Sequence, residues 1–135
     1  MIRIRQGPEY EAREIWEACC PSDFWPRSHF HWIAYDGDKP VAFGSLRILE
    51  NEPHWAYMCA AAVLPGYRGA GLQRRLIRAR VNWARRHGLH GLVTYTLWNN
   101  YGSLISLLRE KFRFYEPGYA WAGRDVHYYV RELKK

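Results

Sequence analysis

Cysteine is scarce in this sequence, and long apolar runs are absent. The three cysteines, Cys19, Cys20 and Cys59, match neither a zinc-ligand spacing nor a disulfide framework. No apolar run approaches the ~20 residues that a membrane-spanning helix needs, and residues 1–5 lack the apolar core of a signal peptide. We therefore expect a cytoplasmic protein with no metal site and no membrane partner.

Acidic residues are missing from a long central part of the chain. From Pro53 through Arg109 there is no Asp or Glu, whereas eight arginines fall there. The rest of the chain has twelve Lys and Arg against thirteen Asp and Glu, so the formal net charge of +7 comes from this one stretch. Such a stretch attracts an anion, either a phosphate-bearing cofactor, a nucleic acid or an acidic protein. The alternative is a solvated basic helix face.

Apolar residues, in contrast, are plentiful. Hydrophobic residues make up 48% of the chain and aromatic residues 16%, which is more apolar surface than a disordered chain leaves in water. A length of 135 residues corresponds to about one domain. We expect residues 1–135 to form a single domain.

Hydrophobic periodicity predicts strands that alternate with helices. The clearest helix spans residues 71–87, where Leu72, Leu76 and Trp83 recur on one face and Gly88 suits a left-handed cap. Two further helices are predicted, one opened by Gly7 and Pro8 and closed by Pro21, and one over residues 99–110. The predicted strands cover residues 2–5, 31–35, 41–48, 55–64, 91–97, 112–115 and 126–133.

The order of these elements indicates the fold class. The strand over residues 55–64 is an almost unbroken, alanine-rich apolar run, which is typical of a strand buried on both faces. The helix after it leads to the strand over residues 91–97, so these two strands should be parallel neighbours joined by a right-handed crossover. The sequence predicts an α/β (α+β) protein, with a mixed central sheet of about six to seven strands and helices on both faces.

A glycine-rich turn separates the predicted central strand from the clearest helix. Gly66, Gly69 and Gly71 leave backbone N–H groups unblocked at the positive end of a helix dipole, a geometry that binds phosphate. A P-loop ending is absent, and Arg74 stands where a dinucleotide-binding fingerprint needs its third glycine. The alternative is that these glycines only form a tight turn.

This turn resembles the cofactor motif of the GNAT superfamily of acyl-CoA-dependent N-acyltransferases, Arg/Gln-x-x-Gly-x-Gly/Ala. The matching residues, with those flanking the motif, are Val63, Pro65, Arg68, Gly71, Leu72 and Leu76. Gln73 stands at the last small-residue position. The next helix is similar to the family pattern Asn-x-x-Ser-x-x-Ser-Leu that ends in Gly-Phe, with matches at Asn100, Ser103, Ser106, Leu107 and Phe112. Lys111 replaces the glycine. Together with the element order, the likeness covers nearly the whole chain and implies a GNAT-like acyl-CoA N-acyltransferase fold.

The resemblance implies that acetyl-CoA is the co-substrate. Asn100 and Ser103 would lie on its thiol side, and main-chain groups near Ala61 and Val63 would pair with the pantetheine arm. The arm fits there because, in this family, the central strand and its parallel neighbour part and leave unpaired edges. The diphosphate would be held by the backbone N–H groups of Arg68, Gly69, Ala70, Gly71, Leu72 and Gln73.

The family reaction is the direct attack of an amine on the acetyl thioester, and it needs a neutral amine. At neutral pH, deprotonating a lysine amine costs about 4 kcal/mol and an α-amine about 1 kcal/mol or less. Family members often have a glutamate on the central strand as base, but Tyr57 and its neighbours include no carboxylate. The candidate bases are Glu52 and His54, with Glu50, at the entrance of that strand and acting through a water molecule.

The proton donor to the departing thiolate also differs from the family pattern. Leu107 stands where many family members have a tyrosine. We expect Ser106 to provide the thiol-side hydrogen bond, with Tyr101 or Tyr115 as alternatives. The hydroxyl of Ser106 is a weak acid, so it would orient and polarise the thiolate rather than protonate it fully.

The sequence thus predicts an acyl-CoA-dependent N-acetyltransferase, whose acceptor is a small-molecule or peptide amine. Two alternatives stay open. The basic segment Arg74–Arg86 would suit a nucleic-acid-binding module, and the missing tyrosine and strand carboxylate would suit a non-catalytic acyl-CoA sensor of the same fold. A homodimer is a further partner that the sequence leaves open.

Overall fold

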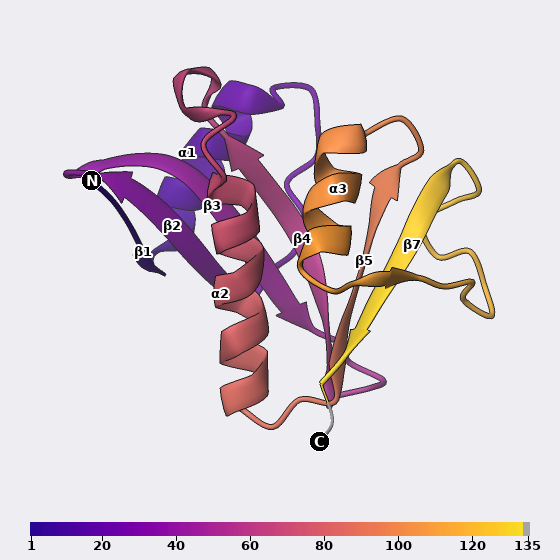
Figure 1. The fold of residues 1–135 in the computed structure, drawn as a ribbon. Helices are drawn as coiled ribbons and strands as arrows, with labels where there is room; N and C mark the ends of the chain where they lie inside the picture. Colours follow the sequence, from indigo (N-terminus) through magenta and orange to yellow (C-terminus); the bar gives the residue numbers. More distant parts are fainter. Residues whose placement is uncertain (134–135) are drawn as a thin grey trace.

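The computed structural model describes residues 1–133, which form one sheet and its covering helices (Figure 1). The strands are β1 (Ile2–Gln6), β2 (Phe30–Asp36), β3 (Lys39–Ile48), β4 (Trp55–Val63), β5 (Gly91–Leu97), β6 (Arg113–Phe114) and β7 (Val126–Glu132). The helices are α1 (Glu9–Cys19), α2 (Leu72–Arg86), α3 (Tyr101–Arg109) and the single 3-10 turn η1 (Pro65–Tyr67). None of the helices described in residues 1–133 is both long enough and apolar enough to cross a membrane.

The seven described strands form one mixed sheet in the order β1-β2-β3-β4-β5-β7-β6. β4 and β5 are parallel, and every other neighbouring pair is antiparallel. α2 makes the crossover between the two parallel strands, as the sequence predicts. The predicted fold class, a mixed sheet of six to seven strands with helices on both faces, is confirmed.

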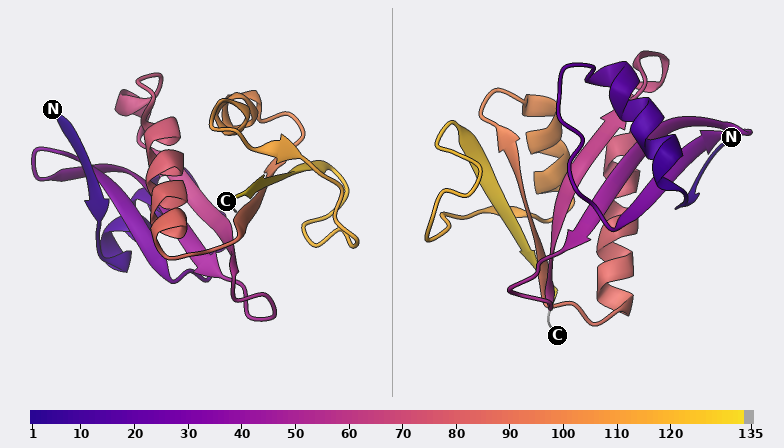
Figure 2. Two further views of the ribbon diagram at one scale, coloured as in Figure 1. Left: turned by 60° about the horizontal axis from the view of Figure 1, so that its bottom comes forward. Right: turned by 180° about the vertical axis from the view of Figure 1, so that it is seen from behind.

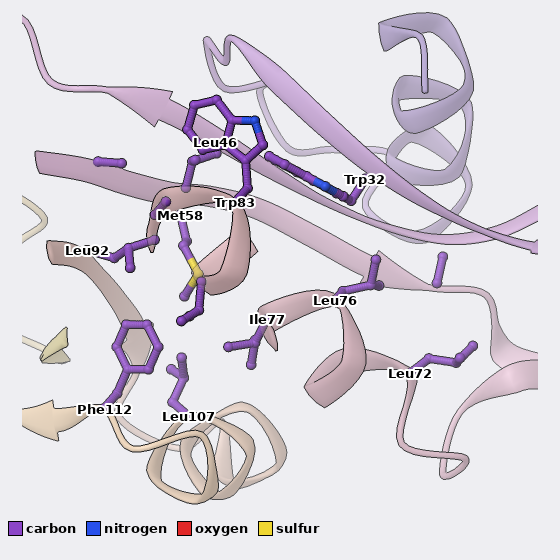
Figure 3. Close-up of a cluster of buried hydrophobic side chains, with 14 of the residues drawn as sticks. Trp32, Leu46, Met58, Leu72, Leu76, Ile77, Trp83, Leu92, Leu107 and Phe112 are labelled. Atoms are coloured by element: carbon purple, nitrogen blue, oxygen red, sulfur yellow. The ribbon is translucent and has the colours of Figure 1, made fainter. Parts of the chain in front are cut away.

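Helices cover the two faces of the sheet unequally (Figure 2). α1 packs on one face, where its Ile15 meets Ile33 of β2 and Phe43 of β3. α2 and α3 lie on the other face, over a larger core. Figure 3 shows that core, which includes Trp32, Leu46, Met58, Leu72, Leu76, Ile77, Trp83, Leu92, Leu107 and Phe112. Each large side chain buried there stabilises the fold by roughly 1.5–3 kcal/mol, which fixes α2 and α3 on the sheet.

β4 has a bulge in its middle. Tyr57 pairs with Arg47 and Ala60 pairs with Ser45, so two β4 residues, Met58 and Cys59, lie opposite Leu46 alone. An extra residue of this kind bends a strand and increases its local twist, and such bulges are common next to functional sites. The bulge therefore turns the second half of β4 away from the direction of its first half.

The bulge marks the point where β4 and β5 part. β4 pairs with β5 only through Trp55, Ala56 and Tyr57, and Figure 1 shows the two strands together at one end and well apart at the other. At the fork, the hydroxyl of Thr94 donates to the carbonyl of Met58 at 2.8 Å, so a side chain occupies the next ladder position. Beyond it, the edge of β4 that faces β5 is unpaired by strand hydrogen bonds.

Candidate functional site

A cleft of about 610 Å³ lies along the second half of β4, beyond the point where β4 leaves β5. Its walls come from the second half of β4, the glycine turn, the start of α2 and one side of α3. Nearly all the residues expected from the sequence to bind a cofactor line it, together with the expected catalytic serine: Ala61, Val63, Arg68, Gly69, Gly71, Leu72, Gln73, Asn100, Ser103 and Ser106. Ala70 belongs to the same turn but is exposed and is not among the lining residues.

The glycine turn presents unsatisfied backbone donors to this cleft. Gly69 and Gly71 have φ angles of +82° and +79°, which non-glycine residues rarely adopt. Nothing lies within 4 Å of the point where a Cβ would stand on either glycine. Gly71 is also the N-cap of α2, and no side chain caps the helix there. The first N–H groups of α2 thus lack intrahelical partners, so the turn fits a phosphate-bearing ligand.

The free edge of β4 faces the same cleft. Leu64 donates to the carbonyl of Val41 on β3 at 2.9 Å. Because bonding direction alternates along an antiparallel ladder, the main-chain groups of Ala61 and Val63 point away from β3, toward the gap. The carbonyl of Val63 accepts from Arg68 Nε at 2.8 Å. Arg68 thus uses its side chain to hold an edge group that was expected to pair with pantetheine.

Gln73 closes the cleft on the side of α3. Its Nε2 donates to the hydroxyl of Ser103 at 2.8 Å, and the side chain of Asn100 caps α3 by accepting from the N–H of Ser103 at 3.2 Å. The departure from the family's small residue therefore ties the first turns of α2 and α3 together. The Gln73 side chain points to Ser103, which leaves its backbone N–H for the turn.

Of the three candidates for the thiol-side hydrogen bond, Ser106 is the one that lines the cleft. Tyr101 is 60% exposed on α3. Tyr115 follows β6 and lies with the β6–β7 link, where it borders a different cavity. The geometry therefore favours Ser106 over the two tyrosines.

A second cavity of about 210 Å³, the inner cavity, adjoins the cleft at the fork between β4 and β5. It shares Ala61, Asn100 and Ser103 with the cleft and is lined further on by Tyr57 and Arg80. Among the described residues that line either cavity there is no Asp or Glu. The inner cavity therefore offers hydroxyls, a thiol and a guanidinium, but no carboxylate base.

Burial shifts the pKa values of the ionisable groups in the inner cavity without changing their charge at neutral pH. It raises the pKa of the Tyr57 hydroxyl, and the neighbouring Tyr95 adds to the effect. Burial also raises the pKa of the Cys59 thiol to about 11 and lowers the pKa of Arg80 to about 10. At neutral pH, Tyr57 and Cys59 are thus uncharged and Arg80 is positive.

The expected bases Glu52 and His54 are not brought to the cleft. Both are exposed in the turn between β3 and β4, and the ring of His54 stacks on His90 with centroids 4.7 Å apart. This end of β4 is where Trp55 pairs with Gly91, so the sheet is closed there. The cleft opens beyond the bulge, toward the other end of the strand, so the structure places these two side chains at the opposite end of β4 from it.

Much of the positive charge of the acid-free stretch is used within the protein. Arg74 and Arg78 both pair with Glu110, each at 2.8 Å. Arg75 donates to the carbonyl of Ile2 at 3.1 Å, and Arg80 is buried. The basic face expected over Arg74–Arg86 is therefore reduced, because one arginine is buried and two share one carboxylate, while Arg75, Arg85 and Arg86 stay exposed.

Arg80 is the residue that the sequence interpretation missed. It falls within the basic segment Arg74–Arg86 that the sequence assigns to a nucleic-acid-binding alternative, but it is 3% exposed and lines the inner cavity. Its spacing carried a signal, since it comes four residues after Leu76 and four before Ala84, both on the buried face of α2. An arginine on an apolar stripe is rarely buried without a reason.

Comparison with known proteins agrees with this description of the fold. A family model described as the acetyltransferase (GNAT) family matches residues 2–114. The chain therefore belongs to the GNAT family of acetyltransferases. No curated protein matches it in sequence.

Solved structures with similar folds carry acetyltransferase names. An IAA acetyltransferase from Bacillus cereus ATCC 14579 has a TM-score of 0.81 at 17% identity, over 98% of this chain and 100% of that chain. The ribosomal-protein-S18-alanine N-acetyltransferase from Escherichia coli has a TM-score of 0.77 at 18% identity, over 100% of this chain and 96% of that chain. A structure described as a streptothricin acetyltransferase from Bacillus anthracis, in complex with acetyl coenzyme A, has a TM-score of 0.65 at 21% identity. The match covers 81% of this chain and 65% of that chain. At these identities the likeness shows the fold alone.

Proposed function

We propose that this chain is a single-domain N-acetyltransferase that moves an acetyl group from acetyl-CoA to a primary amine by direct attack in a ternary complex. The observation that carries the proposal is the parting of β4 and β5 beside the uncapped N-terminus of α2. The acetyl-CoA complex of the Bacillus anthracis neighbour supports the choice of co-substrate.

In this proposal, different residues of the cleft bind different parts of acetyl-CoA. The backbone N–H groups from Arg68 to Gln73 hold the diphosphate through charge-assisted hydrogen bonds. The free edge of β4 at Ala61 and the N–H of Val63 pair with the amides of the pantetheine arm. Asn100 and Ser103, which line the cleft, would border the thiol end. Acetyl-CoA supplies the thioester, and the reaction forms a C–N bond, breaks the C–S bond and releases one amine proton.

The inner cavity favours an amine that arrives neutral. Its lining has no carboxylate, and the positive charge of Arg80 disfavours a second cation next to it. An α-amine whose neighbouring carboxylate is absent, or is neutralised by a bound cation, loses its proton at a cost of about 1 kcal/mol or less at neutral pH, whereas a lysine amine costs about 4 kcal/mol. We therefore propose an acceptor with an α-amine, which gives up its proton to water before it attacks.

Ser106 orients the departing thiolate in this proposal. Its hydroxyl lies on the side of α3 that faces the cleft, and a hydrogen bond to a charged acceptor contributes roughly 1.5–3 kcal/mol. The proton for the thiolate then comes from solvent through this hydroxyl.

Acetyl-CoA binding by calorimetry tests the proposal directly. We expect saturable binding by the wild type and a loss of at least thirtyfold in Gly71→Glu, which places a carboxylate at the diphosphate site. Gly37→Glu is the matched control, because Gly37 also has a positive φ, +62°, but lies in the turn between β2 and β3. An equal loss in both variants, or no binding by the wild type, would contradict the proposal.

Thiol release from acetyl-CoA separates an enzyme from an acyl-CoA sensor of the same fold. The assay is run with amino acids, peptides, polyamines and aminoglycosides as acceptors. We expect turnover with at least one α-amine. Tight acetyl-CoA binding without release for any acceptor would favour the sensor instead.

A further inference from the structure

We infer that the acceptor carries a carboxylate close to its amine, as a free amino acid does, and that Arg80 binds this carboxylate. The inference rests on the proposed function, because it treats the inner cavity at the fork of β4 and β5 as the acceptor site. Four features of the structure carry it: the isolation of Arg80, the space made for it, the size of the cavity and the aromatic walls.

Arg80 is a buried cation without an acidic partner. Its Nε donates to the carbonyl of Leu76 and its Nη1 to the carbonyl of Ser45, both at 3.1 Å. Within residues 1–133, no carboxylate lies within 4 Å of its guanidinium, whereas Arg74 and Arg78 on the same helix share one. Two neutral carbonyls do not offset the cost of taking this charge out of water, so an anion in the cavity would be bound strongly.

The sheet makes room for this guanidinium. A Cβ on Gly44 of β3 would stand 2.7 Å from the Cζ of Arg80, so any other residue there would push the group away. Gly44 has no positive φ that would require glycine on its own account. The close approach to Arg80 is therefore the physical reason for a glycine in the middle of this strand.

The cavity places an anion bound by Arg80 next to the reacting groups. Arg80 lines the same volume of about 210 Å³ as Ala61 and Ser103, which also line the cofactor cleft. A space this small holds a molecule of amino-acid size, in which the amine and the carboxylate are one carbon apart. A polyamine would bring a second ammonium group into a cavity that has no lining carboxylate to receive it.

Two of the aromatic side chains that line this cavity, Tyr57 and Tyr95, form one aromatic wall. The rings of Tyr57 and Tyr95 stack with centroids 6.4 Å apart. Trp121, from the link between β6 and β7, packs edge-on against both, at 5.2 Å and 5.6 Å. Tyr128 holds that link by donating to the carbonyl of Gly123 and accepting from the N–H of Ala122. An apolar or aromatic side chain of the acceptor would pack on this wall.

Matched acceptors test the inference in the wild-type protein. We compare phenylalanine, phenylalanine amide and a tripeptide that begins with phenylalanine at saturating acetyl-CoA. The amide has the more acidic ammonium group, so amine reactivity alone favours the amide. We expect kcat/KM to be at least thirtyfold higher for phenylalanine. Equal values, or a preference for the tripeptide, would overturn the inference and favour a protein N-terminus as acceptor.

Two variants assign the preference to Arg80. Arg80→Met keeps an unbranched apolar stem and removes the guanidinium with its charge, so the preference for phenylalanine over its amide should disappear. Arg80→Lys should keep part of it. Retention of the full preference in Arg80→Met would overturn the role of Arg80, as would equal losses for both acceptors.

A binding measurement covers the case in which a variant fails to fold. N-Acetylphenylalanine and its amide are titrated into the wild type with saturating CoA, and we expect the carboxylate form to bind at least tenfold more tightly. If CoA binds but the two forms bind equally, the inference fails and the proposed function stands. If acetyl-CoA and CoA do not bind at all, both fail.

Discussion

Ser106 is the side chain on which the thiol end of the proposed reaction depends. Replacing it by alanine removes one hydrogen bond to a developing charge, so kcat should fall about tenfold or more. The KM for acetyl-CoA should change less than twofold, because the diphosphate and pantetheine contacts remain. Steady-state kinetics of Ser106→Ala measures both quantities.

The two tyrosines provide the controls for that variant. Tyr101→Phe and Tyr115→Phe should retain wild-type kcat, since neither side chain lines the cleft. A large fall in kcat in either tyrosine variant, with little change in Ser106→Ala, would transfer the role to that tyrosine.

Single residues were predictable from the sequence where a short motif fixed their place. Gly69 and Gly71 need only the local turn, which their own backbone freedom creates. Glu52 and His54 were placed at the entrance of the central strand correctly, but their distance from the cleft depends on where β4 leaves β5. The buried position of Arg80 could not be predicted locally, because the space for its guanidinium is left by Gly44, which is 36 positions away in the chain.

The edge of β4 makes a prediction at the scale of elements. The N–H of Ala61 points into the cleft and should exchange with deuterium readily in the free protein. Acetyl-CoA should slow this exchange by at least tenfold, because the pantetheine arm pairs with it. The N–H of Ala62 points to β3 and should be protected with or without acetyl-CoA. Equal protection of both amides in the free protein would show that the strand edge is closed.

Glu110 makes a second prediction at this scale, because it joins α2 to α3. It is buried, and burial alone would raise its pKa, but hydrogen bonds and charge from Arg78 and Arg74 outweigh burial and hold the pKa below 4.5. A lowered pKa means that the charged form stabilises the fold above the ordinary pKa, and that this contribution is lost as the pH falls through the folded-state value.

The melting temperature of Glu110→Gln tests this coupling of pH and stability. At pH 7 it should lie about 4 °C or more below that of the wild type. The difference should shrink as the pH falls below 4.5, because the wild-type carboxyl then takes up a proton. Glu132→Gln is the control, since its pair with Arg113 is exposed and contributes little. A difference that does not change with pH would contradict the ionic role of Glu110.

The charge of the whole molecule predicts how binding responds to salt. The formal net charge is +7, concentrated between residues 53 and 109, and it should attract an anionic cofactor at long range. Raising NaCl from about 50 to about 500 mM should weaken acetyl-CoA binding about fivefold through screening. Calorimetry at several salt concentrations measures the change, and affinity that does not depend on salt would contradict it.

A generic DNA duplex, measured in the same salt series, tests the nucleic-acid alternative. Arg74 and Arg78 are paired with Glu110 and Arg80 is buried, so Arg75, Arg85 and Arg86 are the cations of α2 left to neutralise phosphates. We expect weaker binding than for acetyl-CoA and a shallow log–log slope. A slope of several, with affinity above that for acetyl-CoA, would support a nucleic-acid partner instead.

The sequence by itself determined the helices and strands, their order and the glycine turn at the start of α2. These features depend on hydrophobic spacing and backbone freedom within about ten residues, so they can be recognised without knowing what packs against them. The fold class followed from their order, because the rules for connecting strands allow only a small number of arrangements.

The tertiary structure alone decided where the chemistry can take place. The cleft exists because the bulge at Met58 and Cys59 bends β4 away from β5, and pairing between distant strands sets that bend. The same pairing closes the end of the sheet near Glu52 and His54, and it brings Gly44 under α2 to accept the guanidinium of Arg80. Contacts between segments far apart in the chain leave no local pattern, so only the folded protein shows them.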